Sequence, residues 1–140
     1  MSLRARAVAQ GRRHLWHVGP NRELRTIAEA AKHARDGDIV EVDAGDYRRD
    51  SAVWTQDRLS IRAMGGRVRL LAEGGSAEGK AIWVVRGGDI DIAGFDFHGA
   101  RVPSGNGAGI RFESGRLTLN GCRFLDNEMG LLSPSFSIWR

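Results

Sequence analysis

The chain has 140 residues, a length that suits one folded domain. Its hydrophobic share of 41% and charged share of 27% exclude a disordered chain, and no apolar run is long enough to span a bilayer as a helix. The formal net charge is +4, but the arginines are scattered among acidic residues and no aromatic residues interleave with them, which argues against nucleic-acid binding.

The first segment, residues 1–17, is expected to form a basic N-terminal arm. It carries Arg4, Arg6, Arg12 and Arg13, and short charged termini are usually frayed and solvated. The segment lacks the apolar middle of a secretory signal. The sequence as given therefore predicts a cytoplasmic protein, or a secreted one if a signal peptide has been removed, and the localisation stays open.

One short helix is predicted over residues 27–35. Thr26 and Glu29 have the spacing of a capping box, and the alanines between residues 28 and 34 favour a helix. The turn sequence Asp36-Gly37-Asp38 ends this helix. A strand with one buried face is predicted directly after it, over residues 39–42.

An internal repeat dominates the rest of the chain. Residues 90–97 align with residues 117–124, and an earlier, weaker copy begins at Leu59. In each copy apolar side chains alternate, a small residue (Ala63, Gly94 or Gly121) permits a sharp corner, and another apolar strand precedes the copy. Such units cannot bury their apolar faces alone, so they stack as the coils of a solenoid.

The stacking of the repeats predicts specific contacts in the interior. Ile61, Ile92 and Leu119 are expected in one column, and Phe97 is expected over Phe124. Residues 134–140 contain no capping sequence, and an uncapped solenoid edge invites association. We therefore expect either the first part of a longer solenoid or a homo-oligomer formed through the open C-terminal end.

The N-terminal half also carries a family resemblance. Val18-Gly19-Pro20, Leu24 to Ala31, Gly37 to Val42 and Ala44 to Tyr47 occur in the order cap helix, Gly-Asp turn, first strand and Gly-x-Tyr. This order resembles the opening of right-handed parallel β-helix proteins of the pectate-lyase-like superfamily. Repeat and resemblance together predict an all-β solenoid over residues 18–140, a right-handed parallel β-helix of about three coils with an N-terminal capping helix.

The resemblance implies carbohydrate chemistry without choosing a reaction, because the superfamily includes polysaccharide lyases, glycoside hydrolases, esterases and epimerases. Its lyases bind calcium through acidic side chains on an outer sheet face and neutralise the carboxylate of an acidic glycan. By this resemblance the candidate calcium ligands are Asp89, Asp91 and Asp96, and the candidate substrate-binding residues are Arg62, Arg86, Arg116 and Trp83.

Each candidate has a plainer interpretation. An aspartate beside a turn or on a solvated strand face commonly serves solubility and turn formation, and Trp83 equally suits a packed core. The leading hypothesis is a polysaccharide lyase or glycoside hydrolase with an acidic polysaccharide as its partner, and neither nucleic acid nor a membrane is expected. The alternative is a non-catalytic structural or glycan-binding module, or a fragment without activity of its own.

Overall fold

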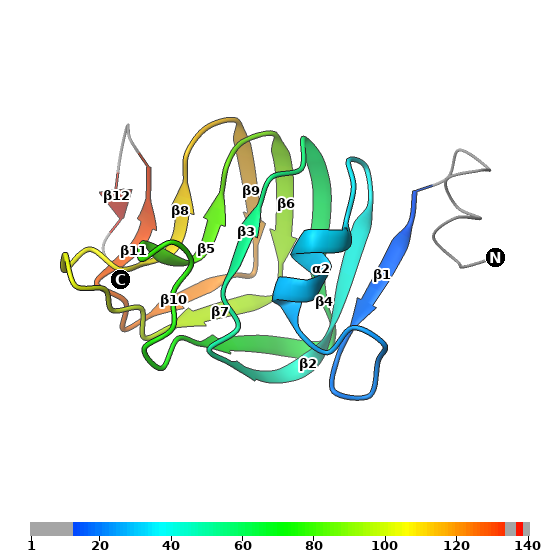
Figure 1. The fold of residues 1–140 in the computed structure, drawn as a ribbon, viewed down its shortest axis with the longest axis horizontal. Helices are drawn as coiled ribbons and strands as arrows, with labels where there is room; N and C mark the ends of the chain where they lie inside the picture. Colours follow the sequence, from blue (N-terminus) through cyan, green and yellow to red (C-terminus); the bar gives the residue numbers. More distant parts are fainter. Residues whose placement is uncertain (1–12, 134–136, 139–140) are drawn as a thin grey trace.

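The chain forms a parallel β-solenoid of about four turns with one short helix near its N-terminal end (Figure 1). This computed structural model describes residues 13–133 and the backbone of residues 137–138. The fold confirms the predicted β-helix with an N-terminal helix, and its coiling is consistent with the right-handed form. It has about one coil more than expected, because residues 39–54 form a coil of their own before the first repeat.

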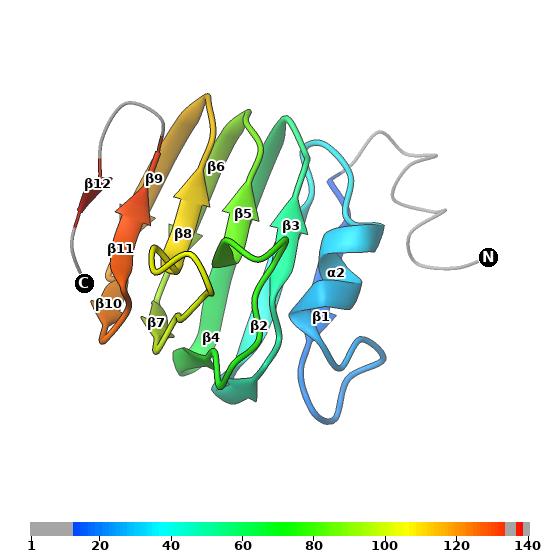
Figure 2. The same cartoon turned by 60° about the vertical axis from the view of Figure 1, so that its left-hand side comes forward.

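Three walls of stacked strands surround the interior (Figure 2). The first wall contains β1 (Leu15–Val18), the first parts of β2 (Ile39–Arg48) and β4 (Arg58–Leu71), β6 (Asp89–Ala93) and β9 (Arg116–Asn120). The second wall contains the later parts of β2 and β4, then β7 (Phe95–His98) and β10 (Arg123–Leu125). The third wall contains β3 (Ala52–Trp54), β5 (Ala81–Val85), β8 (Ala108–Phe112), β11 (Met129–Leu132) and the antiparallel strand β12 (Ser137–Ile138).

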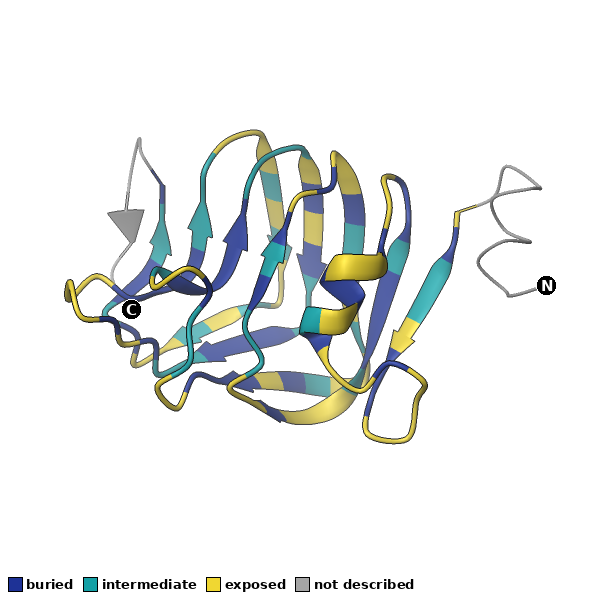
Figure 3. Ribbon diagram, in the orientation of Figure 1, coloured by how far each residue is buried: buried dark blue, intermediate teal, exposed yellow. Residues whose placement is uncertain are grey.

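The strand register confirms both predicted columns. Ile61 pairs with Ile92, and Ile92 with Leu119, along the first wall. Phe97 pairs with Phe124 along the second wall. Apolar residues at alternate positions therefore point into one continuous core, and buried and exposed residues alternate along β6 in Figure 3.

Corners of the coils fall at glycines with positive φ. Gly94 joins β6 to β7 with φ +84°, as the repeat predicted. In the preceding coil the corner lies at Gly65 and Gly66, not at Ala63, because both glycines have positive φ and the pairing register with β2 breaks between Met64 and Val68. A non-glycine residue in this left-handed region would be strained.

The helix α2 (Ile27–His33) begins at the predicted capping box, in which Thr26 and Glu29 hydrogen-bond each other's backbone N–H groups. It ends two residues earlier than residue 35, because Ala34 already has an extended backbone. Its buried face lies beside β3, the edge strand of the third wall (Figure 2). The helix therefore covers an edge that would otherwise be open.

The solenoid begins earlier than residue 18, because β1 pairs in parallel with β2 and starts at Leu15. Arg13 lies just before β1 and donates to the carbonyl of Gly37, whereas Arg4, Arg6 and Arg12 lie outside the described residues. Within residues 13–133, the structure contains no helix of the length and hydropathy needed to cross a membrane.

Candidate ligand-binding face

The outer face of the first wall brings together four of the predicted site residues. On β4, β6 and β9 the apolar side chains point inward, so the intervening polar side chains point outward. The most exposed of these are Arg58, Arg62, Asp89, Asp91, Arg116, Thr118 and Asn120. Arg62, Asp89, Asp91 and Arg116 were predicted from the sequence, and we call this surface the polar face.

A row of alternating charge crosses the polar face. Arg58 pairs in register with Asp89, and Asp89 pairs with Arg116, so the three side chains lie on neighbouring strands about 4.8 Å apart. All three are exposed, and no residue of the described chain forms a hydrogen bond or ion pair with their side chains. Their hydrogen-bonding groups are therefore available to a ligand.

Arg62 is already engaged with a neighbouring coil. Its Nε and Nη2 lie 3.1 and 3.0 Å from Oε2 of Glu41, a residue with little exposed surface. His17 Nδ1 lies 3.6 Å from the other oxygen of Glu41. This ion pair partly neutralises Arg62, so Arg58 and Arg116 are the freer guanidinium groups on the polar face.

Arg86 lies away from the polar face, next to the third wall. It forms an ion pair of 2.9 Å with Glu113 and a second one with Glu78. The hydrogen bond that Arg86 donates to Glu113 is the main cause that lowers the pKa of Glu113, and the hydrogen bonds that Arg86 donates to Glu113 and Glu78 raise its own pKa. The structure therefore does not unite Arg86 with Arg62 and Arg116.

Asp96 is separated from Asp89 and Asp91 and serves a different role. It lies on the second wall with only 1% of its surface exposed. Arg67 Nε and Arg123 Nε each donate to Oδ1 of Asp96, at 2.8 and 2.9 Å, and Arg123 Nη2 donates to Oδ2 at 2.6 Å. Because arginines occupy both oxygens, this corrects the expectation that Asp96 is a calcium ligand.

Trp83 points into the solenoid. It has no exposed surface and packs against Trp54, Phe95 and Phe97, with ring centroids 5.1–5.2 Å away. This corrects the expectation that Trp83 stacks on a substrate, since a fully buried ring cannot reach a ligand at the surface. The plainer interpretation, core packing, is the one that the structure supports.

The residues of the polar face do not fit a resident calcium ion. Calcium takes six to eight oxygen ligands, whereas Asp89 and Asp91 are two carboxylates on one strand, with Cα atoms about 7 Å apart. Among the residues that the structure describes, no cluster of three or more His, Cys, Asp or Glu side chains has a metal-binding arrangement.

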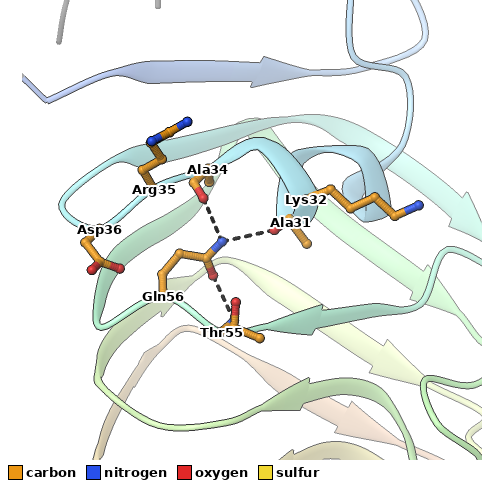
Figure 4. A pocket seen from close by; sticks show the side chains of 7 residues that line it. All are labelled: Ala31, Lys32, Ala34, Arg35, Asp36, Thr55 and Gln56. Carbon is orange, nitrogen blue, oxygen red and sulfur yellow. Dashed lines mark hydrogen bonds between the residues drawn. The ribbon is translucent and has the colours of Figure 1, made fainter.

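A second surface feature lies where α2 meets the first coils (Figure 4). It is an open pocket of about 620 Å³. Gln56 is buried in its floor, and its Nε2 donates to the carbonyls of Ala31 and Ala34, at 3.0 and 2.9 Å. The amide therefore satisfies the C-terminal end of the helix. The lining residues are Ala31, Lys32, Ala34, Arg35, Asp36, Thr55 and Gln56.

The sequence reasoning missed Arg58, Arg67 and Gln56. Arg58 lies one residue before the aligned repeat, opposite Asp89, so extending the alignment by one position would have found it. Arg67 lies in the insertion that lengthens β4, which has no counterpart in the later copies. No local pattern around Gln56 indicates that its partners are carbonyls more than 20 residues away.

No family model, curated protein or solved structure matches this chain. The polar face offers two free guanidinium groups, two exposed carboxylates and two small polar side chains on adjacent strands. Guanidinium groups bind carboxylates in a bidentate manner, and carboxylates accept hydrogen bonds from hydroxyl groups. Such a surface suits an extended ligand that carries both groups.

Proposed function

We propose that this protein binds an acidic glycan along the polar face, as a carbohydrate-directed β-helix related to the polysaccharide lyases and hydrolases of the pectate-lyase-like superfamily. The observation that carries the proposal is the row Arg58, Asp89 and Arg116, which has no partner within the described chain. Uronates carry one carboxylate and several hydroxyl groups per sugar. The row offers complementary groups for both.

The spacing of the row supports an extended ligand. Arg58 and Arg116 lie two strand spacings apart, about 10 Å between their Cα atoms, with Asp89 between them. A glycan chain that runs across the strands would place carboxylates at the two guanidinium groups and hydroxyl groups at Asp89. Thr118 and Asn120, on the same strand as Arg116, offer further hydrogen bonds.

A second candidate function is a non-catalytic scaffold. It is favoured by the ion pairs on the other walls, where Asp96, Glu113 and Asp46 are each paired with arginines of neighbouring coils. Side chains paired in this way stabilise the stack and are not free for a ligand. If the protein is a scaffold, the charged side chains of the polar face bind no ligand and only keep the protein soluble.

Thermal unfolding separates the two candidates. A ligand that binds only the folded state raises the unfolding midpoint, so we expect uronate oligosaccharides to raise it and neutral oligosaccharides of equal length to leave it unchanged. The variant R58A/R116A should lose this rise. The matched control R35A removes an exposed arginine elsewhere and should keep it. No rise with any uronate would favour the scaffold.

A further inference from the structure

Two arginines approach Gly37, at the side of the polar face that borders β2. Arg13 lies just before β1, and its Nε donates to the carbonyl of Gly37 at 2.6 Å. Arg58 begins β4, which pairs with the opposite edge of β2, and its Nη2 would lie 3.7 Å from a Cβ added to Gly37. Both guanidinium groups therefore reach the same residue, and Gly37 has no side chain to separate them.

Neither arginine has an acidic partner. The two acidic residues beside this glycine are Asp36 and Asp38, but hydrogen bonds from backbone N–H groups engage both carboxylates. No carboxylate of the described chain forms an ion pair with Arg13 or Arg58. Residues 1–12, which precede Arg13, contain no Asp or Glu. The positive charge at this place is therefore not balanced by a neighbouring side chain.

The arrangement does not stabilise the fold by itself, because two guanidinium groups close to each other repel. Arginines on the second wall are placed differently. Arg69 pairs with Asp46, and Arg123 pairs with Asp96, so each positive charge there faces a negative one on a neighbouring strand. An anion bound between Arg13 and Arg58 would replace the repulsion with two attractive contacts. The pair therefore suits an anionic group of a ligand.

The number of free donors favours an oxyanion with three terminal oxygens. A carboxylate has two oxygens, and one guanidinium satisfies both with parallel hydrogen bonds. After its hydrogen bond to Gly37, Arg13 keeps the N–H groups of both Nη atoms, and the side chain of Arg58 has no partner in the described chain. Two guanidinium groups can thus surround a sulfate or phosphate ester, whose three oxygens accept hydrogen bonds from more than one direction.

We infer that Arg13 and Arg58 bind a sulfate ester of the acidic glycan beside Gly37. The inference rests on the proposed function, because the glycan that carries the ester is the ligand of the polar face. Sulfate esters occur on uronate polysaccharides, and the several N–H groups of Arg58 allow it to contact a uronate carboxylate as well. The ligand class is then a sulfated uronate chain, with its ester at Arg13 and a carboxylate at Arg116.

Calorimetric titration with two matched ligands tests the inference. The ligands are a sulfated uronate oligosaccharide and the same oligosaccharide after chemical desulfation. We expect the unmodified protein to bind the sulfated form about tenfold more tightly. R13A should bind both forms with the affinity of the unmodified protein for the desulfated form. The matched control R25A removes another exposed arginine without an acidic partner and should keep the tenfold preference.

The outcomes separate this inference from the proposed function. Equal binding of the two forms by the unmodified protein, or an equal loss of preference in R13A and R25A, would overturn the inference and leave the proposed function standing. Binding of neither form would contradict the proposed function itself. A single-stranded oligonucleotide of the same length should bind more weakly than the sulfated oligosaccharide. Equal or tighter binding of the oligonucleotide would overturn the assignment to a sulfated glycan.

Discussion

Phe124 lies almost parallel to Phe97, with ring centroids 5.2 Å apart and an angle of 12° between the ring planes. The two rings occupy successive levels of one interior column, but only Phe97 is fully buried. Each coil of a solenoid is stabilised by its neighbours, so a residue with a coil on both sides contributes more than one at the end.

We therefore predict unequal effects of truncating the two rings. F97A removes a fully buried ring and should lower the free energy of unfolding by about 4 kcal/mol. F124A should lower it by about half as much, because part of that ring is already in contact with water. Urea unfolding of both variants measures the difference, and equal losses would contradict this gradient along the stack.

Asp96 is expected to link stability to pH. Burial by itself would raise the pKa of its carboxyl, but the hydrogen bonds from Arg123 and Arg67 outweigh burial and hold the pKa below its usual value. Because the pKa is lowered in the folded state, ionised Asp96 stabilises the folded protein at pH values above its unfolded pKa of about 4. This stabilisation is lost as the pH falls through the folded pKa. D96N should be less stable than the unmodified protein at pH 7.

The matched measurement compares urea unfolding at pH 7 and pH 3. The difference in stability between D96N and the unmodified protein should shrink at pH 3, because the stability that ionised Asp96 contributes declines once the pH falls below its unfolded pKa of about 4, whereas D96N has no carboxyl at this position. D89N, which changes an exposed carboxyl without a protein partner, should unfold like the unmodified protein at both values. If the difference in stability between D96N and the unmodified protein stays constant with pH, the ion pairs of Asp96 with the two arginines do not contribute to stability.

The glycine corners predict a graded effect of added methyl groups. Gly94 has φ +84°, and a Cβ there would lie 2.9 Å from Cβ of Ala63. Gly121 has φ +60° with open space around it. G121A should therefore cost about 1 kcal/mol from backbone strain alone, and G94A should cost about 2–3 kcal/mol. Thermal unfolding measures the loss of stability in both variants. A smaller loss for G94A than for G121A would contradict the close packing of the corner at Gly94.

Gln56 should stabilise the attachment of α2. Q56A removes the donor to the carbonyls of Ala31 and Ala34 and leaves both without this partner, which should cost about 2 kcal/mol. T55A changes the exposed neighbouring side chain and should cost much less. Urea unfolding of the two variants makes the comparison. Equal stability of Q56A and T55A would mean that the helix end does not depend on the amide.

The repeat predicted the fold because stacking depends on periodic residues. Ile61, Ile92 and Leu119 recur in the sequence as they recur in space, so the alignment alone placed them in one column. The helix was equally local, since Thr26 and Glu29 lie within one turn. The first coil was missed as a separate level because residues 39–54 contain no copy of the repeat.

The residues of the candidate site could be predicted only where they follow the alternation of inward and outward side chains in the repeat. Asp89, Asp91 and Arg116 face outward because their apolar neighbours face inward. Trp83 precedes the irregular Gly87-Gly88 segment, which obscures the alternation, and its orientation was therefore not fixed by pattern. The partners of Asp96 lie 29 and 27 residues away on other coils, and only the strand register brings them together.

An NMR titration of backbone amides with a uronate oligosaccharide shows whether the polar face binds an acidic glycan. We predict saturable shifts at Arg58, Asp89, Asp91, Arg116 and Thr118, and none at Lys32 or Arg35 beside the helix. A neutral oligosaccharide of the same length should leave all these signals unchanged. Shifts confined to the pocket beside α2, or no shifts at saturating uronate, would contradict the claim.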